Sequence, residues 1–206
     1  MKKDKLILFD WGNIVESHST GYSNINAWND LLKACGYNEE DAYKKVSSYR
    51  LSAISTIGQF KKVYERIKND LGLSTDYDEF IDKYKYYFNK IDYYKEVRDY
   101  ELSLKDKCYV GILSNLLIFD KERIDKQLGL SGYDYVFLSF ELGVRKPDME
   151  IYKKVYEKLP FKKENILFID DRGNNIESAK KFGFKTLQAT GLELDKIKEA
   201  CEKFLE

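Results

Sequence analysis

The sequence predicts an α/β protein in which a doubly wound parallel sheet forms the core and a small bundle of helices is inserted into it. Two observations support this fold class. In the second half of the 206-residue chain, short apolar runs alternate with segments of helical periodicity, as in βαβ units. Between the first apolar run and the second, residues 16–95 show helical periodicity with almost no strand pattern.

The first strand of the predicted sheet is Leu6-Ile7-Leu8-Phe9, an apolar run that ends abruptly in Asp10. Four consecutive apolar residues are typical of a strand that is buried on both faces. Gly12 and Asn13 follow, and both residue types tolerate the positive φ of a sharp turn. Because ligands bind beyond the carboxyl ends of parallel strands, Asp10 stands where chemistry is expected.

Residues 16–95 are predicted to form an inserted helical cap domain, and residues 1–15 and 96–206 to form the core domain. Four amphipathic helices with short connections are expected in the insert, because apolar residues recur there at helical spacing. Their expected positions are residues 28–35, 41–53, 60–71 and 80–91.

The remaining strands are predicted from the apolar runs of the second half, at residues 108–113, 135–138, 166–169 and 184–188. Helices are expected between them, because apolar residues recur with helical spacing and Pro and Gly mark the ends. Their expected positions are residues 121–128, 147–159, 173–182 and 197–205.

The composition is that of a globular protein with no nucleic-acid or membrane partner. Lys and Arg together number 35, as do Asp and Glu, so no net charge favours binding to a polyanion. The three cysteines are widely spaced, which favours free thiols in the cytoplasm over a disulfide framework or a zinc site. No apolar run approaches the length of a membrane span, and the oligomeric state is left open.

Polar residues follow three of the predicted strands, as Asp10, Ser114-Asn115 and Asp170-Asp171. If these strands run parallel, their carboxyl ends meet at one edge of the sheet. Lys146 precedes a proline, and its cation is expected to face an anion at the same edge. Three carboxylates brought together favour a divalent cation, and oxygen-only ligands suit Mg²⁺. An Asp nucleophile, Mg²⁺ and a Lys are the parts needed for phosphoryl transfer.

At these residues the chain resembles the haloacid dehalogenase-like hydrolase superfamily. The four segments that carry the resemblance occur in the family's order and cover nearly the whole chain: Phe9-Asp10-Trp11-Gly12-Asn13, Leu113-Ser114-Asn115, Leu142-Gly143-Val144-Arg145-Lys146-Pro147 and Ile169-Asp170-Asp171, followed by Asn175. The resemblance implies a Rossmann-like core with a cap of the helical type. Among family members, the motif wording is most similar to bacterial phosphatases of α-D-glucose 1-phosphate.

The resemblance also implies roles for the residues at the sheet edge. Asp10 would be the nucleophile, Lys146 would neutralise developing charge, and Ser114 and Asn115 would hold the phosphoryl oxygens. Trp11, by contrast, either contacts the substrate or packs beneath the cap.

By the same resemblance, Mg²⁺ would be held by Asp10, the main-chain carbonyl of Gly12 and Asp171, with Gly12 also close to the phosphoryl group. Asp170 and Asn175 would support these ligands from behind.

One departure from the family pattern concerns the proton that the leaving group needs. Most phosphatases of this family carry a second Asp two positions after the nucleophile, where this chain has Gly12. General acid–base catalysis contributes roughly 10²–10⁴ in rate, so another residue is expected to replace the missing acid. His18 and Glu16 are the candidates for this role. A sugar 1-phosphate has a less basic leaving oxygen and needs less protonation, which fits a glycine here.

The leading hypothesis is therefore a Mg²⁺-dependent phosphatase of a small phosphorylated metabolite, such as a sugar phosphate, working through an aspartyl-phosphate intermediate. A dehalogenase or phosphonate hydrolase is the alternative enzyme class. A dehalogenase gains nothing from the acidic pair, and a phosphonate hydrolase needs a Schiff-base Lys that no pattern singles out. A third alternative is a phosphate-binding or regulatory module without turnover, because Gly12 replaces the second Asp.

Overall fold

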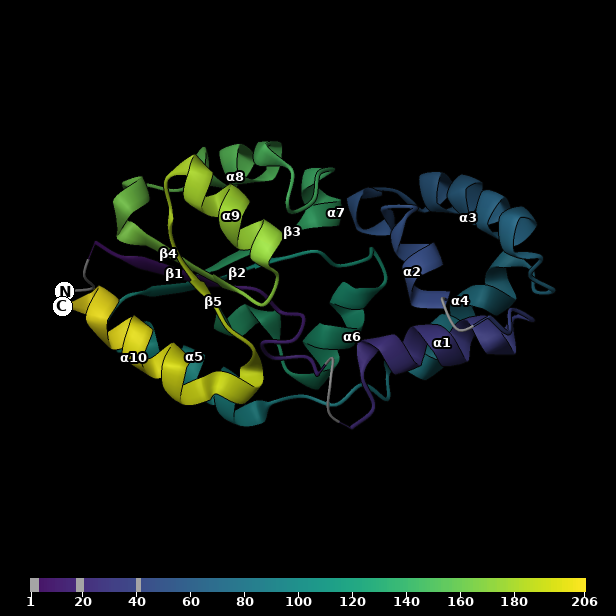
Figure 1. Ribbon diagram of the computed structural model, residues 1–206, viewed down its shortest axis with the longest axis horizontal. Coiled ribbons are helices and arrows are strands. Elements are labelled where there is room, and N and C mark those ends of the chain that lie inside the picture. Colours follow the sequence, from purple (N-terminus) through teal and green to yellow (C-terminus); the bar gives the residue numbers. More distant parts are fainter. Residues whose placement is uncertain (1–3, 18–20, 40–41) are drawn as a thin grey trace.

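The computed structural model describes residues 4–17, 21–39 and 42–206 and contains a five-stranded, fully parallel sheet (Figure 1). The strand order is β3-β2-β1-β4-β5. The strands are β1 (Leu6–Phe9), β2 (Tyr109–Ser114), β3 (Tyr135–Leu138), β4 (Ile166–Asp170) and β5 (Lys185–Gln188). The predicted doubly wound parallel sheet is thus confirmed.

Strand β1 lies at the centre of the sheet, and its register fixes the candidate site. Phe9, its last residue, pairs with Ile112 on β2 and with Ile169 on β4. The residues that follow these positions therefore emerge side by side at one edge. All four side chains of β1 are fully buried, as the uninterrupted apolar run predicts.

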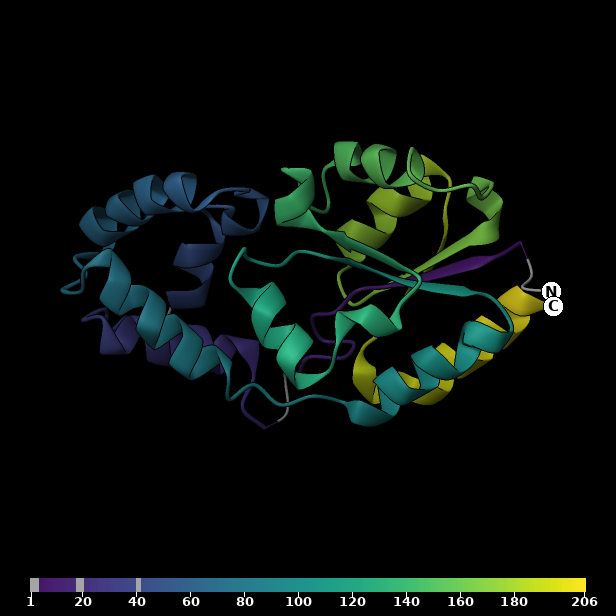
Figure 2. The same cartoon turned by 180° about the vertical axis from the view of Figure 1, so that it is seen from behind.

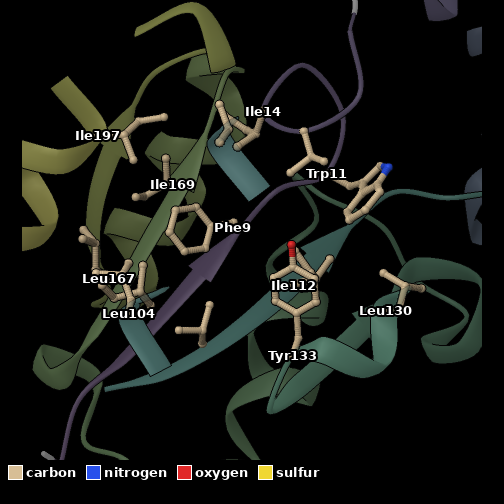
Figure 3. Packing of buried hydrophobic residues seen from close by; sticks show 14 of the residues in the cluster. Phe9, Trp11, Ile14, Leu104, Ile112, Leu130, Tyr133, Leu167, Ile169 and Ile197 are labelled. Atoms are coloured by element: carbon tan, nitrogen blue, oxygen red, sulfur yellow. The ribbon is translucent and has the colours of Figure 1, made fainter. Parts of the chain in front are cut away.

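Helices cover both faces of the sheet, because alternate residues of a strand point to opposite faces. Ile7 and Phe9 join one apolar cluster with α5 (Lys95–Ser103), α6 (Asp120–Gln127) and α10 (Leu194–Leu205), which Figure 3 shows. Leu6 and Leu8 join a second cluster with α8 (Met149–Tyr156) and α9 (Gly173–Phe182) on the other face. A short helix, α7 (Ser139–Leu142), follows β3.

Four further helices form what we call the helical insert, which lies beyond the carboxyl ends of the strands, next to α6 and α7 (Figures 1 and 2). They are α1 (Asn24–Ala34), α2 (Ala42–Ser47), α3 (Ile57–Leu71) and α4 (Tyr77–Phe88), and they share an apolar cluster of their own. Side-chain oxygens of Ser23, Thr56 and Asp76 cap three of these helices at their N-termini. The domain boundaries at residues 15/16 and 95/96 stay a prediction.

One helix of the insert is shorter than its pattern predicts. A helix is expected over residues 41–53, but α2 ends at Ser47 and a separate 3₁₀ turn covers Leu51–Ala53. Arg50, which lies between α2 and this turn, adopts a left-handed conformation with φ of 53°, so a right-handed helix cannot continue through it. Further 3₁₀ turns cover Leu104–Asp106, Leu130–Gly132, Lys163–Asn165 and Gly191–Glu193.

All three cysteines, Cys35, Cys108 and Cys201, are buried free thiols. Among the helices formed by the described residues, none combines the length and the apolar character that a membrane crossing needs.

Candidate active site

Asp10 lies at the base of the candidate site, directly after β1. Its main-chain N–H donates to the carbonyl of Ile169 at 2.8 Å, which extends the pairing of β1 with β4 by one residue. Its Oδ1 accepts hydrogen bonds from the Trp11 N–H and the Ser114 hydroxyl, both at 2.7 Å, and lies 2.8 Å from the Lys146 ammonium. Three donors thus fix one carboxylate oxygen, and no described residue donates to Oδ2.

Lys146 is a fully buried cation between two carboxylates. Its Nζ lies 2.8 Å from Asp10 Oδ1 and 2.6 Å from Asp170 Oδ2, and its side chain has no exposed area. The side chain of Asn115 holds the main chain of Lys146, because its Nδ2 donates to the Lys146 carbonyl and its Oδ1 accepts from the Lys146 N–H, both at 2.9 Å. Asn115 therefore positions the lysine, a contact that its sequence pattern does not reveal.

The charges of these groups shift one another's pKa. Burial alone raises the pKa of Asp10, but the charge of Lys146, with hydrogen bonds from Lys146, Ser114 and Trp11, holds it below its ordinary value. Burial raises the pKa of Asp170 against the opposing charge of Lys146. Burial lowers the pKa of Lys146, yet the two carboxylates more than compensate, so this pKa is raised. Asp10 is therefore held as a carboxylate and Lys146 as an ammonium.

A group of three carboxylates fits a divalent cation. Asp10, Asp170 and Asp171 each offer an oxygen, and these oxygens lie within 4.8 Å of one another. Asp171 accepts a hydrogen bond from Asn13 Nδ2 at 3.1 Å, which orients its carboxylate. Oxygen-only donors at this spacing suit Mg²⁺.

Asp170 differs from the other two carboxylates because its oxygens are already saturated. Asn175 Nδ2 lies 3.0 Å from both of them, the Arg172 N–H donates to Oδ1 at 2.8 Å, and Lys146 binds Oδ2. Asn175 is itself held by the Tyr152 hydroxyl, which donates to its carbonyl at 2.9 Å. Asp170 thus holds Lys146 in place and is itself held by Asn175, which also lines the pocket described below.

Trp11 and Gly12 occupy different positions around the site. The Trp11 indole is fully buried in the cluster of Figure 3, packs edge-on against Tyr93 and does not line the pocket. The indole therefore packs in the core cluster and not in the pocket described below, while the main-chain N–H of Trp11 donates to Asp10. Gly12 lines this pocket, and its contact with the phosphoryl group stays a prediction.

A pocket lies between the strand ends and the helical insert. The site residues Asp10, Gly12, Ser114, Asn115 and Asp171 line its base. Arg145 from the third motif and the candidate acid Glu16 line its wall. Further side chains of the wall lie outside the motifs: Asn24, Trp28, Tyr43, Tyr84, Phe88, Asp120 and Arg172.

Part of this wall is a buried network of charges. The Arg123 guanidinium donates to Glu16 at 2.8 Å and to Asp120 at 3.2 Å, and the Tyr84 hydroxyl donates to Asp120 at 2.6 Å. Asn24 donates to the other oxygen of Glu16 at 3.1 Å. The only sequence signal for this network is the Asp120–Arg123 spacing, and that spacing is common on solvated helices. The other candidate acid, His18, lies outside the described residues.

A family model described as haloacid dehalogenase-like hydrolase matches residues 7–189, which include every residue of the sheet-edge group. This chain belongs to the haloacid dehalogenase-like hydrolase family. It is thus an enzyme of the hydrolase class. A curated relative, the D-ribitol-5-phosphate phosphatase of Bacteroides thetaiotaomicron, is 25% identical over 196 residues, covering 89% of this chain and 91% of the relative.

Solved structures of the family share the fold. A wild-type family enzyme of Bacteroides thetaiotaomicron, in complex with magnesium and inorganic phosphate, superposes with a TM-score of 0.71 at 21% identity, covering 92% of this chain and 96% of that one. An L-2-haloacid dehalogenase from Xanthobacter autotrophicus gives a TM-score of 0.65 at 20% identity, with 92% and 78% covered. Because a family enzyme that binds magnesium and inorganic phosphate shares this fold with a haloacid dehalogenase, the fold alone does not choose between phosphatase and dehalogenase chemistry.

Proposed function

We propose that this protein hydrolyses phosphomonoesters of a small metabolite through an aspartyl-phosphate on Asp10. The observation that carries the proposal is the arrangement at Asp10, whose Oδ1 is fixed by three donors while Lys146 and the acidic group surround it. A carboxylate held in this way keeps Oδ2 for attack and stays ionised.

In the proposed reaction, Asp10 Oδ2 attacks phosphorus, the bond from phosphorus to the ester oxygen breaks, and the leaving oxygen takes up a proton. Water then hydrolyses the acyl phosphate and releases inorganic phosphate and the free Asp10. Ser114 and Lys146, both within 2.8 Å of Asp10 Oδ1, are placed to stabilise charge on the transferred group. The Asn115 side chain acts by holding Lys146, and its main-chain N–H stays a candidate donor to the phosphoryl oxygens.

Asp10, Asp171 and the Gly12 carbonyl would hold Mg²⁺, which offsets the charge of the carboxylates and the substrate when it is bound. Asp170, saturated by Lys146 and Asn175, would act as a positioning residue. The acidic group favours phosphatase over dehalogenase chemistry, because displacing a halide from an uncharged carbon needs no cation.

The pocket wall supports a hydroxyl-rich substrate such as a sugar or sugar-alcohol phosphate. Carboxylate and amide oxygens of Glu16, Asn24 and Asp120 can accept hydrogen bonds from hydroxyl groups, and the rings of Trp28 and Phe88 can pack against C–H faces. The ribitol-5-phosphate phosphatase is a relative that acts on such a compound. Balanced charge and buried free thiols support a cytoplasmic enzyme with a small-molecule substrate.

The decisive experiment is a screen of sugar and sugar-alcohol phosphates with and without Mg²⁺. Asp10→Asn should abolish turnover with every substrate, whereas Asp195→Asn, a matched change on the exposed start of α10, should not. Anomeric phosphates should turn over faster than primary alkyl phosphates, because Gly12 supplies no proton to the leaving oxygen. Phosphate binding without any turnover would instead favour a regulatory module, and Mg²⁺-independent dehalogenation would overturn the proposal.

A further inference from the structure

Two arginines in the pocket wall form no ion pair with a carboxylate in the described part of the chain. Arg145, which precedes Lys146, and Arg172, which follows β4, both line the pocket. Arg145 makes a 3.4 Å hydrogen bond to the Lys146 carbonyl, and Arg172 donates to the Tyr43 hydroxyl of α2 at 2.8 Å. Neither guanidinium forms an ion pair with any carboxylate in residues 4–17, 21–39 and 42–206.

The two arginines differ in their charged surroundings. Next to Arg145, the acidic residue closest in chain position is Asp148, which is paired with Arg50. Arg172 directly follows Asp171, and although burial acts to lower the pKa of Arg172, the charges of Asp10 and Asp171 act to raise it. Burial lowers the pKa of Arg145, and the charges of Arg50 and Arg172 lower it further. Cations that face a pocket and repel one another favour an anionic ligand between them.

The two arginines relate differently to the phosphoryl end of the pocket, where Lys146 and Ser114 contact Asp10. Arg172 is attracted by the charges of Asp10 and Asp171. The charges that act on Arg145 are chiefly those of Arg50, Arg172 and Asp148, so Arg145 is the arginine set apart from the phosphoryl end. Arg172 reaches the helical insert through Tyr43, so the pair lies where the insert meets the strand ends.

We infer that the arginine pair binds a second anionic group of the substrate, a carboxylate or a second phosphate, in addition to the phosphoryl group on Asp10. This inference rests on the proposed phosphatase function and narrows its substrate class to phosphorylated sugar acids or sugar bisphosphates. Because Arg172 donates to Tyr43 of α2, an anion bound to Arg172 would also connect the helical insert to the core. Planar guanidinium groups suit either anion, because each can donate two parallel hydrogen bonds.

The test compares three compounds with one carbon skeleton: an alditol phosphate, the matching aldonate phosphate and the matching alditol bisphosphate. The wild-type enzyme should prefer one or both doubly charged compounds, chiefly through a lower KM. Arg145→Gln should reduce this preference, taken as the ratio of kcat/KM values, by roughly 10- to 100-fold, the range of one charge-assisted contact. Arg145→Lys should restore part of it, and Arg66→Gln, on the exposed face of α3, should keep the wild-type ratio.

Two outcomes would overturn the inference. If Arg145→Gln lowers kcat/KM equally for all three compounds, the arginines contact the transferred phosphoryl group instead. If the wild-type enzyme does not prefer the doubly charged compounds, the arginine pair does not bind a second anionic group. Calorimetric binding to the Asp10→Asn variant separates this inference from the proposed function. If no compound is hydrolysed, the phosphatase proposal fails, while tighter binding of the doubly charged ligands that depends on Arg145 would still support the second anion site.

Discussion

Single residues at the sheet edge show which contacts a sequence can and cannot indicate. Because parallel strands end at a common edge, the sequence predicts that Asp10 and Ser114 meet, and the Ser114 hydroxyl donates to Asp10 Oδ1 at 2.7 Å. The direction of a side chain after a turn is less predictable. Trp11 follows Asp10 directly, yet its indole is fully buried in the core cluster. Its carbonyl accepts hydrogen bonds from the N–H groups of Val15 and Glu16, which close the turn around Asn13.

Asn13 combines a turn that the sequence predicts with a side-chain contact that only the structure shows. It has φ of 59° and donates to Asp171 Oδ2 at 3.1 Å, so it joins the turn after β1 to the proposed cation ligand. Asn13→Gly keeps the left-handed turn but removes the amide donor. We expect the Mg²⁺ concentration needed for half-maximal turnover to rise roughly 10- to 100-fold, as for other groups that orient a metal ligand.

The measurement is a Mg²⁺ titration of phosphatase activity, with calorimetric Mg²⁺ binding as a second readout. Asn38→Gly, a matched change at an exposed position of the insert, is the control. An unchanged Mg²⁺ requirement in Asn13→Gly would show that Asp171 does not depend on this donor, or that it does not hold the cation.

Among the helices, α5 carries a buried acid that the catalytic proposal does not use. Glu101 is fully buried; its Oε2 accepts a hydrogen bond from the Tyr133 hydroxyl at 2.6 Å, and its Oε1 has no partner in the described part of the chain. Burial raises the pKa of Glu101 from 4.5 to about 8, although Tyr133 and Arg98 act in the opposite direction. The folded protein thus holds a proton at neutral pH that the unfolded chain releases.

This proton makes stability depend on pH in a definite direction. Because the folded-state pKa is the higher one, the free energy of unfolding should fall as pH rises from about 4.5 to about 8. Glu101→Gln keeps a neutral side chain of the same shape, so it should remove this part of the pH dependence. The variant should match the wild type near pH 5 and be more stable by about 2–4 kcal/mol near pH 8.5.

Urea unfolding at the two pH values measures this difference. Glu199→Gln, on the exposed side of α10, should retain the wild-type dependence on pH. A Glu101→Gln variant that loses stability with rising pH as steeply as the wild type would show that Glu101 is ionised in the fold.

Strands are predicted from this sequence more accurately than the ends of helices. Strand β1 is buried on both faces, so every residue is apolar and the pattern is unambiguous. The helix expected over residues 41–53 stops early because Arg50 takes a left-handed conformation that its residue type does not suggest. The charge network in the pocket wall is harder to predict than either, because Glu16 and Arg123, which form an ion pair, are 107 positions apart in the sequence.

For the whole molecule, one short segment joins the core to the helical insert. It follows Ser114 and Asn115, and its residues alternate between two apolar clusters. Leu116 and Ile118 pack in the cluster beside the sheet, whereas Leu117 and Phe119 pack among the helices of the insert. Phe119 meets Phe60 of α3 edge-on at 5.0 Å. The segment that leads from the site is therefore anchored in both bodies, so we expect them to unfold together.

The two tryptophans allow this coupling to be measured, because Trp11 lies in the core cluster and Trp28 in the insert. Trp28→Phe leaves a reporter of the core, and Trp11→Phe leaves a reporter of the insert. Both reporters should give the same urea midpoint in an otherwise unchanged chain. Leu117→Ala should cost about 2–5 kcal/mol and lower the midpoint reported by Trp28 more than that reported by Trp11.

Leu116→Ala is the matched control, because it removes the same side chain from the neighbouring position but from the core cluster. It should lower the Trp11 midpoint at least as much as the Trp28 midpoint. If Leu117→Ala shifts both midpoints equally, the insert and the core unfold as one unit even without this contact, which would contradict the prediction. If the two midpoints separate, Leu117 is a contact that couples the insert to the core. The insert could then loosen near Ser114 and open the pocket while the core around Asp10 stays folded.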